Sequence, residues 1–162
     1  MGLRWEHMPE RVVTGVFMIH SGWGKLKADE ERAAGMHGMA SGTYPQFGKV
    51  PATTFAKALG AGEIGLGALL LVPTVPTVVA GAALTAFSGG LLGMYWNTPG
   101  LRQEGTPFPT EQGVALAKDS WLAGIGLSLM LGGLRPAARH GRIKEMRARR
   151  AGRKAQRDKQ KD

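Results

Sequence analysis

The sequence contains no cysteine, so this chain by itself forms no disulfide bond, carries out no thiol redox chemistry and ligates no iron–sulfur cluster through cysteine. Charge is also scarce in its centre, because Glu63 is the only charged residue between Ala58 and Leu101. A redox role would therefore require a bound cofactor or a partner protein. What remains in the centre is a long apolar run, and this run determines the rest of the interpretation.

The apolar run indicates two membrane crossings. A hydrocarbon core about 30 Å thick is crossed by roughly 20 helical residues, so residues 58–101 are too many for one crossing and suitable for two. Pro73 and Pro76 divide the run. Since proline lacks the amide proton and ends helices, we expect a tight turn there between two membrane helices.

The pattern as a whole predicts an all-α integral membrane protein, a four-helix transmembrane bundle within residues 1–134. The predicted helices cover about 11–27, 52–72, 77–96 and 110–134. The first is short for a crossing unless Arg11 and Lys25 extend outward along their apolar stems. The alternative is a surface helix, which would leave three crossings and place the N-terminus outside.

The glycines of the predicted helices and the segments between the helices give further structural expectations. Glycines on one face of the first helix and in the second and third helices would let neighbouring helices approach closely. Residues 28–50 are polar but contain methionines and aromatics, which favours a segment lying on the membrane surface or capping the bundle. Residues 97–109 are rich in proline and glycine and predict an ordered loop. Tyr95 and Trp96 before it resemble an interfacial aromatic belt.

The C-terminal tail, residues 135–162, carries the net charge of the chain. It holds twelve of the 21 lysines and arginines and three of the twelve acidic residues, so residues 1–134 are neutral with nine of each. Basic residues beside a crossing are retained in the cytoplasm, which predicts an inner-membrane protein with both termini inside. We expect anionic lipid headgroups to bind the first part of the tail, at Arg135, Arg139, Arg142, Lys144, Arg147, Arg149 and Arg150.

The tail has two other interpretations. It could dock an acidic protein. It could also bind nucleic acid, since its basic residues recur about every third or fourth position, but it lacks aromatics and an apolar pattern that would form a fold.

Ionisable residues within crossings are costly and mark candidate functional sites. They are His20, Lys25, Glu63, Lys118 and Asp119. Pairing Glu63 with Lys25 or Lys118 would relieve two desolvation costs at once. Such a pair either fixes helix register or forms part of a polar pocket for a quinone head group or a small anion. His20 is expected to donate a hydrogen bond between helices. The four histidines have no metal-ligand spacing, so we predict no metal site.

Several motifs resemble the DoxX family of small bacterial membrane proteins. They are Arg11-x3-Gly15-x-Phe17-x2-His20-x-Gly22-x2-Lys25-Leu26, Glu63-Ile64-Gly65-x-Gly67, Asn97-Thr98-Pro99-Gly100 and Lys118-Asp119-Ser120-Trp121. The resemblance covers about residues 11–134 and implies a four-helix transmembrane bundle. The family is named after subunits of an archaeal thiosulfate:quinone oxidoreductase. A mycobacterial relative is associated with a membrane oxidoreductase complex, containing superoxide dismutase and a sulfurtransferase, that acts in oxidative stress defence.

Three functions are compatible with these features. The first is a DoxX-like subunit or anchor of a redox complex with soluble redox partners, in which Lys25, Glu63, Lys118 and Asp119 orient a quinone head group and move its protons. The second is a non-enzymatic scaffold whose tail binds anionic lipid and recruits soluble proteins. The third is a pathway for a small solute or protons. A second copy of the chain is a further expected partner, and whether the chain is itself an enzyme stays open.

Overall fold

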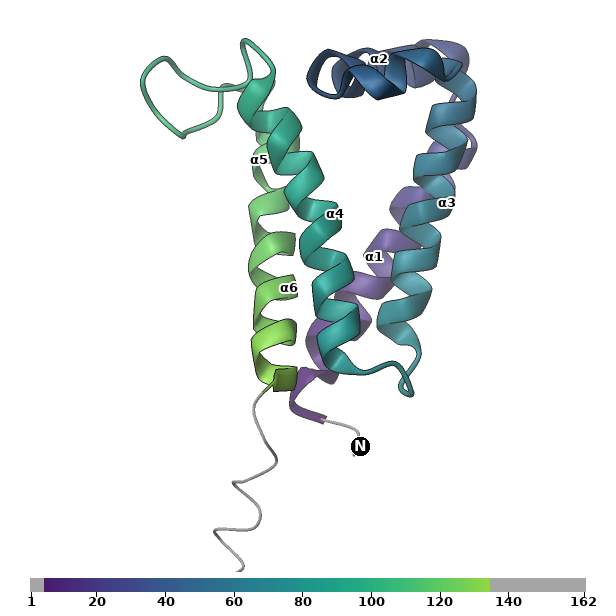
Figure 1. Cartoon of the computed structure of the whole chain (residues 1–162), viewed down its shortest axis with the longest axis vertical. Coiled ribbons are helices and arrows are strands. Elements are labelled where there is room, and N and C mark those ends of the chain that lie inside the picture. The colour runs from purple at the N-terminus through teal and green to yellow at the C-terminus, as the bar shows by residue number, and fades with distance from the viewer. Residues whose placement is uncertain (1–4, 135–162) are drawn as a thin grey trace, which may run out of the picture.

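The computed structural model describes residues 5–134 and is built from helices (Figure 1). The elements in chain order are the 3-10 helix η1 (Trp5–His7), α1 (Met8–Leu26), α2 (Glu30–Thr43), the 3-10 helix η2 (Pro45–Lys49), α3 (Ala52–Leu71), α4 (Thr77–Asn97), the single turn α5 (Val114–Ala117) and α6 (Asp119–Leu134). The only β pairing in the described part is one bridge between Arg102 and Pro109. The all-α prediction is confirmed. The predicted lipid-binding tail lies outside the described residues.

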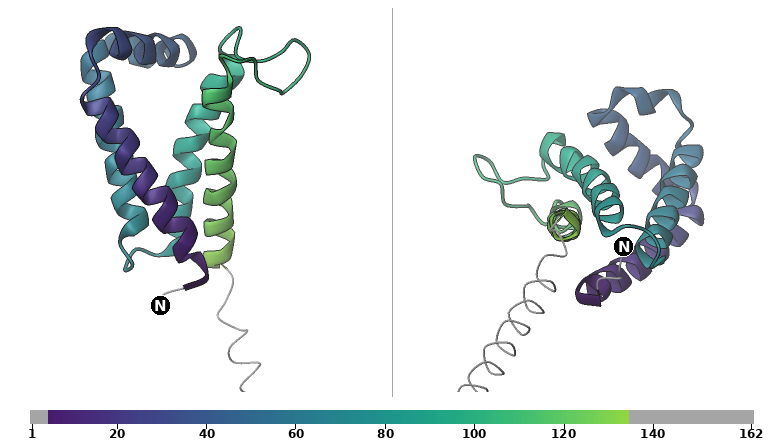
Figure 2. Two further views of the ribbon diagram at one scale, coloured as in Figure 1. Left: turned by 180° about the vertical axis from the view of Figure 1, so that it is seen from behind. Right: turned by 60° about the horizontal axis from the view of Figure 1, so that its bottom comes forward.

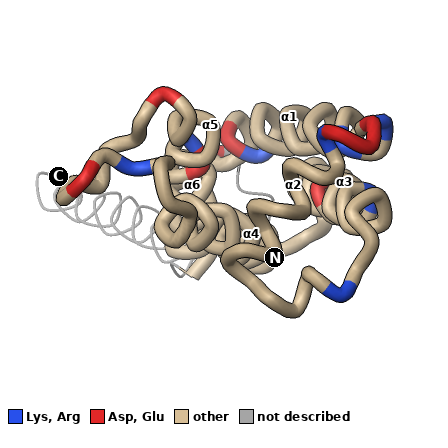
Figure 3. The backbone as a smooth tube through the Cα atoms, turned by 90° about the horizontal axis from the view of Figure 1, so that it is seen from above, with Lys and Arg blue, Asp and Glu red and all other residues tan. Residues whose placement is uncertain are grey.

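Three helical segments are long and apolar enough to cross a membrane: α3, α4 and the continuous stretch Val114–Leu134. Large apolar side chains on the outer surface are exposed rather than packed, including Val13, Val16, Trp23, Trp121 and Leu131. Burying such side chains in lipid is favourable, whereas exposing them to water is costly. The chain is therefore a membrane protein. Viewed from above, the tube shows long stretches without charge, and α4 carries no Lys, Arg, Asp or Glu (Figure 3).

Two helix boundaries differ from those expected. The first helix begins at Met8, three residues before the predicted start, because Pro9 fits the first turn of a helix without losing a hydrogen bond. The last helix begins at Val114 rather than near Thr110. The backbone amide of Thr110 donates to the carbonyl of Leu101, and its hydroxyl donates to that of Gly100, which holds residues 110–113 in a turn. A break at Lys118 then separates α5 from α6.

The helices form two antiparallel pairs arranged as a V. α1 packs along α3, and α4 packs along α6. The pairs converge near the turn that joins α3 to α4 and diverge toward the other end, where α2 lies across the opening (Figures 1 and 2). The N-terminal end of α1 and the C-terminal end of α6 lie together at the converging end (Figure 1). This position of α2 agrees with the expected capping segment.

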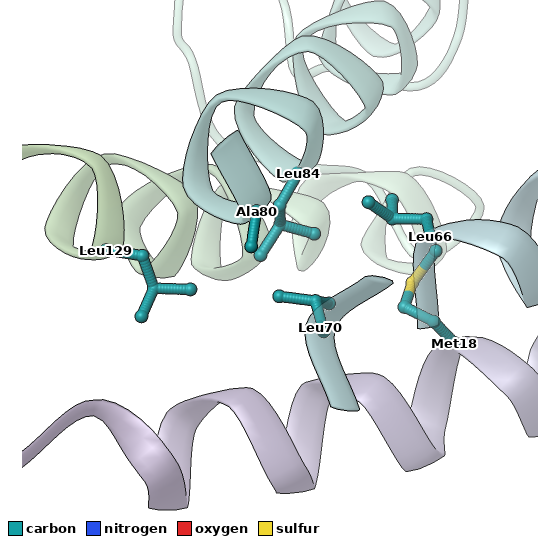
Figure 4. Packing of buried hydrophobic residues seen from close by; sticks show 6 residues of the cluster. All are labelled: Met18, Leu66, Leu70, Ala80, Leu84 and Leu129. Carbon is teal, nitrogen blue, oxygen red and sulfur yellow. The ribbon is translucent and has the colours of Figure 1, made fainter. Parts of the chain in front are cut away.

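The pairs are joined by an apolar core near the converging end. Its fully or almost fully buried members come from both pairs and point toward one another (Figure 4): Met18, Leu66, Leu70, Ala80, Leu84 and Leu129. This core fixes how far the two pairs approach each other at the base of the V. Above it they separate, and that separation creates the space described below.

Each pair is held together by glycines in close contact. A Cβ atom added at Gly67 would lie 2.6 Å from the carbonyl oxygen of Gly15, and one added at Gly60 would lie 2.7 Å from that of Gly22. In the other pair, a Cβ atom at Gly81 would lie 2.7 Å from the carbonyl oxygen of Gly126. Backbones this close leave no room for a side chain, which is the packing typical of membrane helices.

Other glycines face open space. A Cβ atom at Gly62, Gly65, Gly89 or Gly90 would meet nothing within 4 Å. The expectation that the glycines of the third crossing serve close contacts therefore holds for Gly81 but not for Gly89 or Gly90.

Arg11 is buried rather than extended outward, with 4% of its surface exposed. Its guanidinium donates hydrogen bonds to four carbonyl oxygens at the end of α3 and in the following turn: Leu69, Leu70, Val72 and Val75, at 2.7 to 3.2 Å. The last carbonyls of a helix have no partner within the helix, so this side chain satisfies them. Arg11 thus links α1 to the end of α3 at the converging side of the molecule. Because its guanidinium is hydrogen-bonded to these carbonyls, its charge does not prevent α1 from packing within the bundle.

The loop after α4 is ordered by contacts with that helix. The Tyr95 hydroxyl donates to the Pro107 carbonyl at 2.7 Å, and the Arg102 guanidinium lies 4.1 Å from the centre of the Trp96 ring. Tyr95 is 5% exposed and belongs to the protein interior, whereas Trp96 is 56% exposed. Only Trp96 of the predicted aromatic pair is therefore available to the membrane interface.

Candidate functional site

A cavity of about 850 Å³ lies between the two helix pairs and beneath α2. Most of its wall is apolar, with contributions from α1, α2, α3, α4 and α6 that include Met36, Met39, Leu59, Phe87 and Leu91. This volume is within the range of small-molecule binding sites, which are typically apolar with a few placed polar groups. The cavity exists because the core joins the pairs at one end only.

The polar group at the cavity wall is an ion pair between Lys25 of α1 and Glu63 of α3. Lys25 Nζ lies 2.8 Å from Glu63 Oε2 and donates a second hydrogen bond to Ser21 Oγ at 2.9 Å. The side chain of Glu63 is 4% exposed and that of Lys25 is 23% exposed. Long helical side chains lean toward the helix N-terminus, so Lys25 reaches back to the level of Ser21, one turn earlier. Lys25 therefore pairs with Glu63, one of the two partners expected from the sequence, and does not extend outward as a longer first crossing would require.

Two more charged residues line the same cavity from the start of the last helix. They are Lys118, which is exposed, and Asp119, which is half-buried. Asp119 is near enough to Lys25, Lys118 and Glu63 to interact electrostatically with each of them. The structure thus brings together four of the five residues selected from the sequence. With two cations and two carboxylates, the cluster is formally neutral.

His20 is the residue that the structure separates from this cluster. It is exposed on α1 and is not among the residues that line the cavity. Within the described part of the chain, its side chain makes no hydrogen bond to another helix. The predicted interhelical contact of His20 is therefore absent from this structure.

An aromatic cluster borders the cavity beside α2. The tilted rings of Phe47 in η2 and Phe55 in α3 have centres 5.2 Å apart, and His37 of α2 makes an edge-to-face contact with Phe55 at 5.6 Å. The Tyr44 hydroxyl donates to the Gly90 carbonyl at 2.9 Å, which links this segment to α4. Tyr44, Phe47 and Phe55 all line the cavity.

Two residues that contribute to this site, Ser21 and Tyr44, are not among the candidates selected from the sequence. Ser21 precedes Lys25 by four residues, a spacing that places both on one helical face, so this signal could have identified it. No comparable signal identifies Tyr44, because its partner Gly90 is 46 residues away in the sequence.

The paired helices, their lipid-facing apolar surface and the charged cluster inside define a polytopic helical membrane protein with an internal cavity. The chain belongs to the DoxX family, whose model matches residues 8–96. This match contains Lys25 and Glu63 but ends before Lys118 and Asp119. Comparisons with curated proteins and with solved structures returned no match.

Proposed function

We propose that this protein is the membrane subunit or anchor of a quinone-linked redox complex, and that the cavity between the helix pairs holds the quinone. The observation that supports this most directly is the Lys25–Glu63 pair in the wall of a cavity that is otherwise largely apolar. An isoprenoid tail requires an apolar wall, and a head group requires polar partners at one place. Both requirements are met within one space.

The residues present suit such a head group. A quinone carbonyl accepts hydrogen bonds, and the Lys25 ammonium has three donors, of which Ser21 and Glu63 take two. When bound, a quinone supplies two-electron redox chemistry that no side chain of this cysteine-free chain supplies. Electrons would pass between the bound ligand and a soluble redox partner, and a second copy of the chain remains a proposed partner in the membrane.

A cavity-filling substitution tests this proposal. Gly90 lines the cavity, and an added Cβ atom there meets nothing within 4 Å, so Gly90→Leu is expected to occupy ligand space without disturbing the fold. We expect about a tenfold loss of quinone co-purified with the protein in native lipid, equivalent to about 1.4 kcal/mol of binding free energy. The measurement is quantification of the extracted quinones by mass spectrometry.

Gly89→Leu is the matched control, because Gly89 is also free of contacts but does not line the cavity. It should retain the quinone content of the unmodified protein. If no quinone accompanies the unmodified protein, or if both variants retain the same amount, the scaffold function is favoured instead.

We also propose that the protein lies in the bacterial inner membrane with both termini in the cytoplasm. The two ends of the described chain lie on the same side of the bundle (Figure 1), which is consistent with an even number of crossings. The basic tail would then meet anionic headgroups, at about 1 kcal/mol for each basic residue near the surface. A C-terminal green fluorescent protein fusion should fluoresce, and alkaline phosphatase at the same position should be inactive. The reverse result would contradict this orientation.

A further inference from the structure

The second carboxylate oxygen of Glu63, Oε1, is a hydrogen-bond acceptor with no partner among the described residues. Within the described residues, the hydrogen bond and ion pair of this carboxylate both involve Oε2 and Lys25 Nζ. No fully buried polar side-chain atom in this part of the chain lacks a partner. Oε1 therefore keeps some access to open space, and the open space that Glu63 lines is the cavity.

Lys25 presents the complementary group at the same place. Its ammonium has three N–H donors, and two of them are directed to Ser21 Oγ and Glu63 Oε2. A free donor and a free acceptor thus lie side by side in a wall that is otherwise largely apolar. A group that both donates and accepts at one atom satisfies both, and a hydroxyl is such a group.

A quinone carbonyl fits this pair less well. It accepts a hydrogen bond from Lys25 but donates none, so it would leave Glu63 Oε1 unpaired and place two electronegative oxygens near each other. Leaving a buried acceptor unsatisfied is costly, particularly when it is charged. The charges of the four clustered residues also sum to zero. The cluster therefore has no excess positive charge with which to bind a phosphate or carboxylate head group.

We infer that the Lys25–Glu63 pair recognises a hydroxyl on the head group of its ligand, so that the cavity binds a quinol in preference to the corresponding quinone. This inference rests on the proposed function, because it takes the ligand to be a member of the quinone and quinol couple. The inference specifies, in addition, that the site prefers the reduced form of this ligand. The reaction that precedes this protein is then one that reduces a quinone in the same membrane.

The test uses three ligands that share one tail and one ring: decylubiquinone, decylubiquinol kept reduced without oxygen, and the dimethyl ether of decylubiquinol, which cannot donate a hydrogen bond. Dissociation constants are obtained from titrations of the purified full-length protein, followed by tryptophan fluorescence. We expect the quinol to bind about tenfold more tightly than either of the other two, the effect of one charge-assisted hydrogen bond.

The double variant Lys25→Met with Glu63→Met should bind all three ligands with similar dissociation constants. The control Glu104→Gln, in an exposed loop outside the cavity, should keep the tenfold preference. Equal affinity of the unmodified protein for quinol and quinone would overturn the inference and leave the proposed function standing. A preference that persists in the double variant would overturn the inference as well. Binding of none of the three ligands would overturn the proposed function too.

Discussion

Replacing Gly60 with leucine is expected to separate α1 from α3 and to destabilise the protein by at least about 3 kcal/mol, the upper part of the range for overpacked sites. A Cβ atom at Gly60 would lie 2.7 Å from the carbonyl oxygen of Gly22 and 3.1 Å from the amide nitrogen of Leu26. Both are backbone atoms, so no side-chain rotation relieves the contact. The helices would have to move apart along their length, and the Gly15 contact with Gly67 would be lost with them.

Gly62→Leu provides the control for this prediction. Gly62 lies in the same helix, is exposed and has nothing within 4 Å of an added Cβ atom. Leucine has a higher helix propensity than glycine, by roughly 0.5 to 1 kcal/mol in soluble helices, so this variant should be as stable as the unmodified protein or more stable. The measurement is unfolding in detergent by increasing sodium dodecyl sulfate, followed by tryptophan fluorescence. Equal stability of the two variants would show that the Gly22–Gly60 contact does not hold α1 to α3.

The membrane helices were predictable because hydropathy and proline act locally. The apolar run divided by Pro73 and Pro76 predicts α3 and α4 to within about one residue at either end. Which glycines make contact was harder to predict. Gly60 and Gly67 lie seven residues apart and face α1, whereas Gly62 and Gly65 lie on other faces of the same helix. The sequence contains all four, and only the rotation of α3 against its partner distinguishes them.

The candidate site was predictable in its charges but not in its shape. Charged residues in apolar helices are rare, so the sequence alone singles out Lys25, Glu63, Lys118 and Asp119, with Lys25 as one of two possible partners for Glu63. The cavity between them depends on how the two helix pairs diverge above a core contributed by both. The hydrogen bonds of Arg11 could not be predicted from the sequence either. Its four carbonyl acceptors lie 58 to 64 residues away, and backbone carbonyls carry no sequence signal.

The second large effect is expected when only one residue of the Lys25–Glu63 pair is replaced. Removing one partner of a buried ion pair typically costs about 3 to 5 kcal/mol, because the other charge is left buried without compensation. The two single variants should differ in cost. Lys25→Met leaves a carboxylate that is 4% exposed, whereas Glu63→Met leaves an ammonium that is 23% exposed and closer to solvent. We therefore expect Lys25→Met to be the more destabilising change in the same unfolding measurement.

The double variant, with methionine at both positions, determines what the pair contributes. Replacing both charges with apolar side chains of similar length removes the desolvation cost together with the attraction, and such exchanges are often neutral or stabilising. We expect its unfolding free energy to return to within about 1 kcal/mol of the unmodified protein, so that the two single effects are strongly non-additive. A double variant that remains as unstable as Lys25→Met would mean that the pair serves to hold α1 against α3. A stable double variant that no longer retains quinone would instead show that the two charges are kept for the ligand and not for the fold.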